Sequence, residues 1–340
     1  MIFAVVMLVL LIVSVLANFG QWINGLVPVK GVYTRSTGPR LDEVLLEDND
    51  SANKIAVVDI DGIITSRAAD QAGYTMVDLI RAQLDRAKED SKVKAVLLRV
   101  DSPGGEVLAS DEIYRAIGDF QTNSSKPVIT SMGSLAASGG YYVSAASRWI
   151  VANELTITGS IGVILHTWNY RGLMDKVGLQ PEVYKSGKFK DMLSGERSPA
   201  EIPPEERGMV EALIKETYSR FAGVVVEGRD RAHEKNQKEG RALAGEWKDY
   251  ADGRILSGTK AFDLGFVDEI GDFHVAVNRA KKVAHIQRAN LIQYKQRYDL
   301  SDLFRLFGKS QAPVIKVDLG IEPPKLEAGQ LYFLTPTFLH

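Results

Sequence analysis

The sequence predicts an α/β protein built around a mainly parallel sheet, and three observations support this. Apolar, β-branched runs of strand length occur at 55–64 (IAVVDIDGII), 93–100 (VKAVLLRV) and 127–133 (PVITSMG). Segments with the apolar spacing of a helix follow the first two, at about 75–90 and through DEIYRAIGDF (111–120). The order strand, helix, strand, helix, strand is typical of βαβ units, whose strands run parallel.

The alternation continues toward the C-terminus. Further helices are expected at 139–146, near YRGLMDKVG (170–178), over 204–235 and after ADGRILSG (251–258). Further strands are expected at WIVAN (149–153), around IGVIL (161–165) and at PEVYK (181–185), and LGFVDEIGD (264–272) closes the compact part. The helix over 204–235 has prolines at its start and two glutamates in its first turn, both typical of a helix N-terminus.

Composition excludes several classes of function. The chain has 340 residues, 45% of them hydrophobic, which is enough for a large packed core. A net charge of -2 gives no basic field for a polyanion such as nucleic acid. The absence of cysteine excludes disulfides, a thiol nucleophile and thiolate metal sites.

The N-terminal segment predicts contact with a membrane. Residues 2–17 are apolar except for Ser14, and no charged residue occurs before Lys30, so the uncharged stretch exceeds the ~20 residues that a membrane helix needs. We expect a transmembrane anchor over 1–24 and a linker over 25–53. The alternative is a secretory signal peptide cleaved after the small-residue site VLA (15–17). Basic residues follow the segment and none precedes it, which favours a cytoplasmic body.

Common catalytic and nucleotide-binding motifs are missing. There is no G-x-x-x-x-G-K-[ST], no G-x-G-x-x-G after a strand, no H-E-x-x-H and no G-x-S-x-G. None of the five histidines falls in a recognisable motif. Ser257 begins an S-x-x-K sequence, but we interpret it as a helix N-cap.

Two glycine-rich turns remain, and each directly follows a predicted parallel strand: DSPGG (101–105) and AASGG (136–140). The carboxyl ends of such strands are where ligands collect in α/β sheets. Glycine amides can approach a substrate carbonyl closely and form an oxyanion hole, with Ser138 as the neighbouring nucleophile. An ordinary turn followed by a capped helix explains the same pattern.

A serine nucleophile needs a base, and lysine can act as one only when it is uncharged. The candidates are Lys185, Lys188 and Lys190, which crowd around a glycine in YKSGKFKDML (184–193). The alternative for this cluster is a solvated basic loop.

Taken together, DSPGGEV, SMGSLAASGGYYVSAA, TITGSIGVI, YKSGKFKDMLS and DGRILSGTKAFDLGFVDEIG closely resemble the short form of the signal peptide peptidase A family, with the motifs in family order. The resemblance covers about 54–275, and we expect a serine peptidase catalytic domain there and a C-terminal extension and tail over 276–340. It implies a Clp protease/crotonase-like fold of repeated ββα units and a Ser-Lys dyad, without a cofactor or metal.

Carried over residue by residue, the resemblance makes Ser138 the nucleophile and Lys190 the general base. Ser160 then matches the serine that orients the lysine amine, and the amides of Gly105 and Gly139 match the oxyanion hole.

The resemblance also implies partners and a location. We expect a homo-oligomer, an octameric ring whose pockets are shared between subunits, acting on apolar peptides such as cleaved signal peptides. It places the catalytic domain on the extracytoplasmic side of the cell membrane as a single-pass protein, against the charge pattern, and we follow the resemblance. The final residues, QLYFLTPTFLH (330–340), are disordered, packed in the ring, or bound in the substrate groove like a product.

Two other functions stay open at this point. A membrane scaffold with a dead active site would lack Ser138, Lys190 or Ser160, all of which are present. A crotonase-type enzyme acting on acyl-CoA thioesters would need a carboxylate in the site rather than a Ser-Lys pair.

Overall fold

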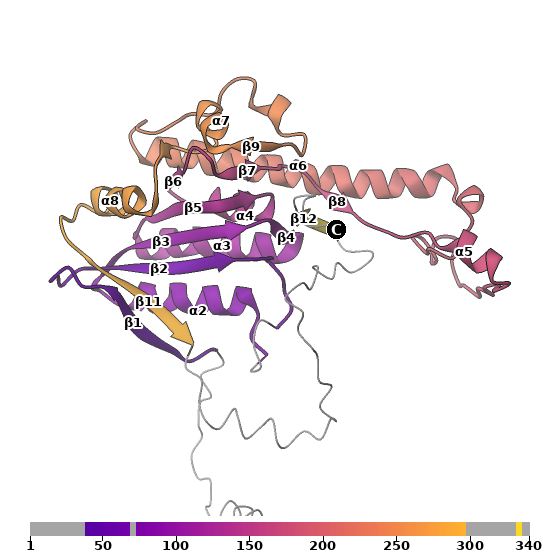
Figure 1. The fold of residues 1–340 in the computed structure, drawn as a ribbon, viewed down its shortest axis with the longest axis horizontal. Coiled ribbons are helices and arrows are strands. Elements are labelled where there is room, and N and C mark those ends of the chain that lie inside the picture. The colour runs from indigo at the N-terminus through magenta and orange to yellow at the C-terminus, as the bar shows by residue number, and fades with distance from the viewer. Residues whose placement is uncertain (1–37, 69–72, 297–330, 335–340) are drawn as a thin grey trace, which may run out of the picture. The chain divides into compact units, whose positions relative to one another are not determined.

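A computed structural model describes residues 38–68, 73–296 and 331–334. It confirms the α/β class with a central, mostly parallel sheet (Figure 1). The strand order is β1-β11-β2-β3-β5-β6-β10, and β7 joins β5 to β9 at one edge. The strands are β1 (Leu41–Glu47), β2 (Lys54–Asp61), β3 (Val93–Ser102), β5 (Val128–Ala137), β6 (Trp149–Ala152), β7 (Ile157–Gly159), β9 (Ile255–Ser257), β10 (Glu269–Ile270) and β11 (Asn290–Gln296).

The central strands read as continuous apolar runs because both faces of the sheet are buried. On β3, Val96 and Leu98 contribute to one hydrophobic cluster, whereas Ala95 and Leu97 contribute to the other. Helices α2 (Met76–Glu89), α3 (Val107–Ser124) and α4 (Gly139–Ser144) cover the first face, and α8 (Phe273–Val283) covers the second. A short helix, α7 (Gly258–Asp263), begins after Ser257, whose side chain caps it as predicted.

The predicted linker contains a strand. Within 25–53, residues 41–47 form β1, which pairs antiparallel with β11. Strand β11 in turn pairs parallel with β2, so part of the predicted C-terminal extension also belongs to the sheet. The linker segment lacks a strong apolar pattern because β1 is an edge strand with most of its side chains exposed.

A second, small sheet has the order β4-β12-β8. Strand β4 (Gly104–Glu106) directly follows β3, and β8 (Ile164–Leu165) follows β7. Strand β12 (Leu331–Leu334), from near the C-terminus, lies between them and pairs antiparallel with both (Figure 1).

Residues 166–220 form an arm that extends away from the sheet (Figure 1). It contains α5 (Arg171–Lys176), a short 3-10 helix (Pro199–Glu201) and the first half of α6 (Pro204–Lys235). The buried residues of α6, apart from Glu206, lie between Phe221 and Ala232, so its second half packs on the body. The strand predicted at 181–185 is wrong: these residues lie in the arm and are mostly exposed, with no neighbouring strand in the described chain.

None of the helices in the described ranges combines the length and apolar character needed to cross a bilayer. The predicted anchor at 1–24 lies outside those ranges.

A buried ion pair joins α6 to the central sheet. The Arg229 guanidinium contacts the Asp268 carboxylate, both side chains are almost wholly buried, and the second Asp268 oxygen accepts from the Ile150 amide at 2.9 Å. Removing one partner leaves the other charge buried without compensation, which typically costs several kcal/mol.

We predict that Asp268→Ala lowers the free energy of unfolding by about 3–5 kcal/mol. The double variant Asp268→Leu/Arg229→Met should recover most of this loss, because no charge is then left buried. Urea denaturation at one fixed protein concentration measures both changes. Asp252→Ala, which removes the exposed Asp252–Arg254 pair, is the control and should leave the midpoint nearly unchanged. An equally small effect of Asp268→Ala would contradict the prediction.

Candidate active site

Ser138 lies between the end of β5 and the first residue of α4, in a strained conformation. Its φ of 53° and ψ of -116° are unfavourable for a residue with a side chain. The side chain is completely buried, and its Oγ has no hydrogen-bond partner in the described chain. Strain and an unpaired buried hydroxyl both cost stability, and such features cluster at functional sites.

Two glycine turns meet beside Ser138. A Cβ on Gly104, which has φ of +101°, would lie 2.6 Å from the Gly139 amide nitrogen, and a Cβ on Gly139 would lie 3.1 Å from the Gly105 nitrogen. Only glycine therefore permits this approach. Ser102 supports the first turn, because its Oγ donates to the Gly62 carbonyl at 2.6 Å and accepts from the Gly104 amide at 3.1 Å.

Ser160 directly follows β7, the strand that neighbours the end of β5 before Ser138. In the β5–β7 register Ala137 pairs with Gly159, and the Ser138 amide donates to the Gly159 carbonyl at 2.8 Å. Ser160 also has a positive φ, of 49°, and is buried. On its other side it lines a cavity of about 710 Å³, bounded by residues 161–164, the arm-side part of α6 and the loop at 248–253.

Strand β12 places a peptide carbonyl at the two glycine amides. On one side of β4, the Ile64 amide donates to the Gly104 carbonyl and the Glu106 amide donates to the Ile64 carbonyl. Successive residues of a strand direct their backbone N–H and C=O groups to opposite sides, so the Gly105 amide and carbonyl face β12. Phe333 is the residue of β12 that pairs with Gly105. A Cβ on Gly104 would lie 2.0 Å from the Phe333 carbonyl oxygen, so this oxygen lies close to the amides of Gly105 and Gly139.

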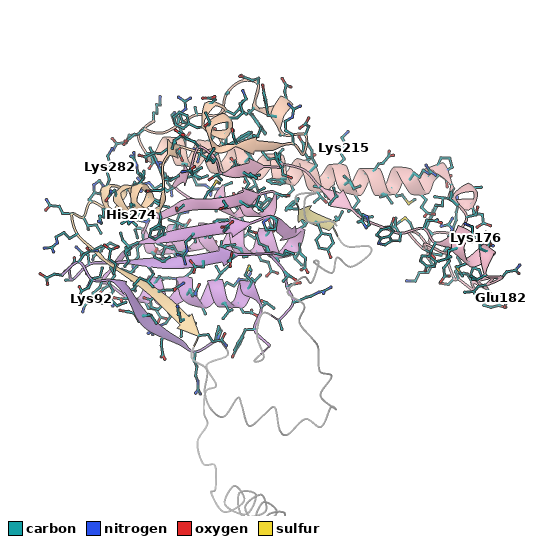
Figure 2. The ribbon with its side chains drawn as sticks, viewed as in Figure 1. Lys92, Lys176, Glu182, Lys215, His274 and Lys282 are labelled. Carbon is teal, nitrogen blue, oxygen red and sulfur yellow. The ribbon has the colours of Figure 1, made fainter. Side chains whose placement is uncertain are left out.

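Lys190 is not brought to Ser138 within the same chain. Lys188, two residues away, pairs with Glu205 in the first turn of α6. Gly228, near the other end of α6, packs against the carbonyl of Ala145 just after α4. The 23 residues from Glu205 to Gly228 span about 35 Å of helix, far beyond the reach of a lysine side chain. Figure 2 shows Lys176 and Glu182, in the same arm, far from the sheet.

The three lysines of the arm loop differ in their partners. The Lys185 Nζ donates to both carboxylate oxygens of Asp191, at 2.7 and 2.8 Å, and Lys188 pairs with Glu205. The Lys185 hydrogen bond lowers the pKa of Asp191, so this carboxylate remains charged. Lys190 is exposed, and in the described chain its amine has neither a hydrogen bond nor an ion pair. Lys185 and Lys188 are thus engaged with carboxylates, whereas the Lys190 amine is available to a further partner.

The structure thus groups Ser138, Ser160, Gly105 and Gly139, and holds Lys190 elsewhere. It also pairs β12, from the C-terminal tail, with β4 at the first glycine turn, which agrees with the alternative in which the tail lies in the substrate groove. Sequence analysis missed Tyr142 and Phe221, whose rings surround Phe333. Tyr142 lies one helical turn after Ser138, which is the only signal that the sequence offers for its place.

Comparison with known proteins identifies the family context of these residues. The model of peptidase family S49 matches residues 121–287, which include Ser138, Ser160 and Lys190. A protein of Enterococcus faecium, provisionally named signal peptide peptidase SppA, is 37% identical over 259 residues, covering 75% of this chain and 71% of the relative. A provisionally assigned protease of Synechocystis sp. is 40% identical over 218 residues, covering 64% of this chain and 70% of the relative. Protease 4 of Haemophilus influenzae is 34% identical over 251 residues, covering 73% of this chain but only 38% of that longer protein.

Proposed function

Because the chain belongs to the SppA-type serine peptidases of family S49, it is a peptide hydrolase, and we propose that Ser138 is its nucleophile and Lys190 of a second copy its general base. This membership sets aside the acyl-CoA enzyme and the inactive scaffold. The observation that carries the proposal is a peptide carbonyl lying at two glycine amides, beside a buried serine hydroxyl without a partner.

The proposed reaction proceeds through an acyl-enzyme. The uncharged amine of Lys190 takes the proton of the Ser138 hydroxyl as its Oγ attacks the substrate carbonyl. The amides of Gly105 and Gly139 stabilise the oxyanion, a contribution typically worth ~3–4 kcal/mol for one donor. The protonated lysine then gives its proton to the leaving amine, and it later activates the water that releases the acid product. The Ser160 hydroxyl holds the incoming amine in position.

The length of the arm supports delivery of the lysine by a second copy. Within one chain about 35 Å of helix lies between Glu205, which pairs with Lys188 in the loop that carries Lys190, and Gly228, which packs against Ala145 just after α4. The cavity lined by Ser160 has room for a side chain that enters from outside. The arm exposes large apolar side chains suited to burial against another copy: Trp168 (72% exposed), Tyr184 (90%) and Val177 (69%). We therefore propose that the protein is a homo-oligomer and, more specifically, that it assembles as an octameric ring.

Strand β12 indicates the kind of substrate. The groove already holds an extended, apolar segment, Leu331–Leu334, by main-chain pairing on both of its edges. This is the strand-addition mode of peptide recognition, in which backbone bonds give affinity and pockets give specificity. We propose that added substrates bind in the same way, and that they are apolar peptides such as cleaved signal peptides. An anchor at 1–24, with the catalytic domain on the extracytoplasmic side of the cell membrane, belongs to the same proposal.

Complementation between variants tests the shared dyad. We predict that Ser138→Ala and Lys190→Ala each lower kcat/KM for an apolar reporter peptide by at least ~1000-fold, because both members act in one step. Lys185→Ala and Lys188→Ala are the matched controls and should retain most of the activity.

Co-expression of Ser138→Ala with Lys190→Ala should restore activity at about a quarter of the sites, because random assembly pairs an intact serine with a neighbour's intact lysine at that frequency. Size-exclusion chromatography verifies that the mixed oligomers form. Mixed oligomers that stay inactive would refute delivery of the lysine by a second copy, whereas full activity of Ser138→Ala alone would refute the nucleophile.

The tail should compete with added substrate. Phe333→Ala removes the buried side chain of β12, so the groove is more often open, and we predict a several-fold rise in kcat/KM for the reporter peptide, mainly through a lower KM. Steady-state kinetics on the intact oligomer measure it. Leu155→Ala, at an exposed apolar residue outside the groove, is the control. The register also allows cleavage of the Phe333–Leu334 bond, because the Phe333 carbonyl lies close to the two glycine amides. Mass spectrometry of the intact chain shows whether this bond is cut. An unchanged or higher KM for Phe333→Ala would show that the tail does not compete.

A further inference from the structure

We propose that Glu106 is a positioning residue for the oxyanion hole: its side chain holds residues 65–66 and thereby fixes the strand that carries the Gly105 amide. The inference rests on the proposed function, in which this amide stabilises the oxyanion, and it adds a side chain that acts on the reaction through the backbone. It is carried by the contacts that the Glu106 carboxylate makes with Thr65 and Ser66.

Strand β4 needs support because two of its three residues are glycines. The close approach to Gly139 requires that Gly104 and Gly105 lack a Cβ, but glycine loses more conformational freedom on folding than any other residue. On one edge β4 pairs with β12, which gives way to substrate in the proposed reaction. When the groove is empty, the opposite edge of β4 is therefore the one that must hold the Gly105 amide in place.

The chain around Ile64 forms this opposite edge. The Ile64 amide donates to the Gly104 carbonyl at 2.9 Å, and the Glu106 amide donates to the Ile64 carbonyl at 2.8 Å. Ile64 and Gly105 form a parallel bridge, and a Cβ on Gly105 would lie 1.9 Å from the Ile64 carbonyl oxygen. The two backbones are in direct contact, so a displacement of the Ile64 segment displaces the Gly105 amide as well.

The Glu106 carboxylate fastens the segment directly after Ile64. Its Oε1 accepts from the Thr65 hydroxyl at 2.8 Å, and its Oε2 accepts from the Ser66 amide at 2.9 Å and from the Ser66 hydroxyl. Burial opposes ionisation of Glu106, but the hydrogen bonds from Ser66 and Thr65 and the charge of Arg67 hold its pKa below its ordinary value. The carboxylate is therefore charged at neutral pH, and hydrogen bonds to a charged acceptor are stronger than those between neutral groups.

The charge of Glu106 would by itself oppose catalysis. A negative charge on the residue next to Gly105 disfavours the second negative charge that develops on the oxyanion. A direct electrostatic role and a positioning role therefore predict opposite signs for Glu106→Gln, which removes the charge but retains an acceptor for Ser66. The direct role predicts a faster reaction, whereas the positioning role predicts a small loss.

Substitutions at both ends of the contact give the expected pattern. We expect Glu106→Ala to lower kcat for the reporter peptide roughly 30-fold, because a misplaced oxyanion donor loses most of its effect. Glu106→Gln and Ser66→Ala, which each retain part of the contact, should lower kcat only ~3-fold. Glu112→Ala, which removes an exposed partner of Arg81 on the same helix, α3, is the matched control and should retain the original kcat.

A pair of inhibitors isolates the effect on the oxyanion. The Ser138 Oγ adds to the carbonyl carbon of a peptide aldehyde, whose oxygen then lies at the two glycine amides, whereas the matching peptide alcohol binds without this addition. The readout is the inhibition constant of the alcohol divided by that of the aldehyde, measured with the full-length oligomer. We expect this ratio to fall ~10-fold in Glu106→Ala and to stay unchanged in Glu112→Ala. Partial unfolding reduces the amount of active enzyme but changes neither constant.

The outcomes separate this inference from the function on which it rests. If the unsubstituted oligomer neither cleaves the reporter nor binds the aldehyde more tightly than the alcohol, the proposed function fails. With an active enzyme, an unchanged inhibitor ratio in Glu106→Ala overturns the inference. A kcat for Glu106→Gln that exceeds the original value, or that is as low as for Glu106→Ala, overturns it as well. Should Glu106→Ala fail to assemble, the ratios of Glu106→Gln and Ser66→Ala decide, and each should lie ~2- to 3-fold below the original.

Discussion

The site depends on one close contact between two pieces of backbone, the turn at Gly104–Gly105 and the residue after Ser138. A side chain on Gly104 would collide with the Gly139 amide and with the Phe333 carbonyl, and one on Gly139 would come within 3.1 Å of the Gly105 nitrogen. Because neither residue has a Cβ, two amides and a peptide carbonyl can occupy the same small volume. The neighbouring parallel strands β3 and β5 hold the turns, so the central sheet fixes the geometry of the amides.

The strain at Ser138 is held by elements on either side of it. Its amide is bonded to the Gly159 carbonyl on β7, and α4 begins directly after it and is buried throughout. These contacts determine the backbone so fully that the unfavourable φ persists, and the hydroxyl is left without a partner. Ser160 is held in a similar way: it has a positive φ, it directly follows β7, which pairs with β5 and β9, and its amide donates to the Arg254 carbonyl at 2.7 Å.

Much of the fold and part of the site were predictable, because they depend on local patterns. Apolar runs gave β2, β3 and β5, and the glycine turns after β3 and β5 had to lie at one edge of the sheet. The place of the Lys190 loop was not predictable, because helical spacing over 204–235 gives the length of α6 but not how much of it leaves the body. The pairing of β1 with β11 and of β12 with β4 was not predictable either. Contacts between residues far apart in the sequence, such as Phe333 with Gly105, leave no local signal.

Helix α6 connects the features that the sequence left apart. Near its middle, the Phe221 ring contacts the Phe333 ring. Near its C-terminal end, Arg229 forms the buried ion pair with Asp268. Its first turn contacts the loop that carries the three lysines (184–193): Glu205 pairs with Lys188, and Glu206 accepts a hydrogen bond from the Leu193 amide. A continuous helix transmits displacement along its axis, so the position of the lysine loop is tied to the packing around the groove of its own chain. Strand β8, directly before the arm, has β12 as its only strand partner in the described chain. Phe221, directly after the arm, contacts Phe333 of β12, so β12 lies against both points where the arm joins the body. In the oligomer that we propose, the strand bound in one groove would help to set where the lysine for the next groove lies.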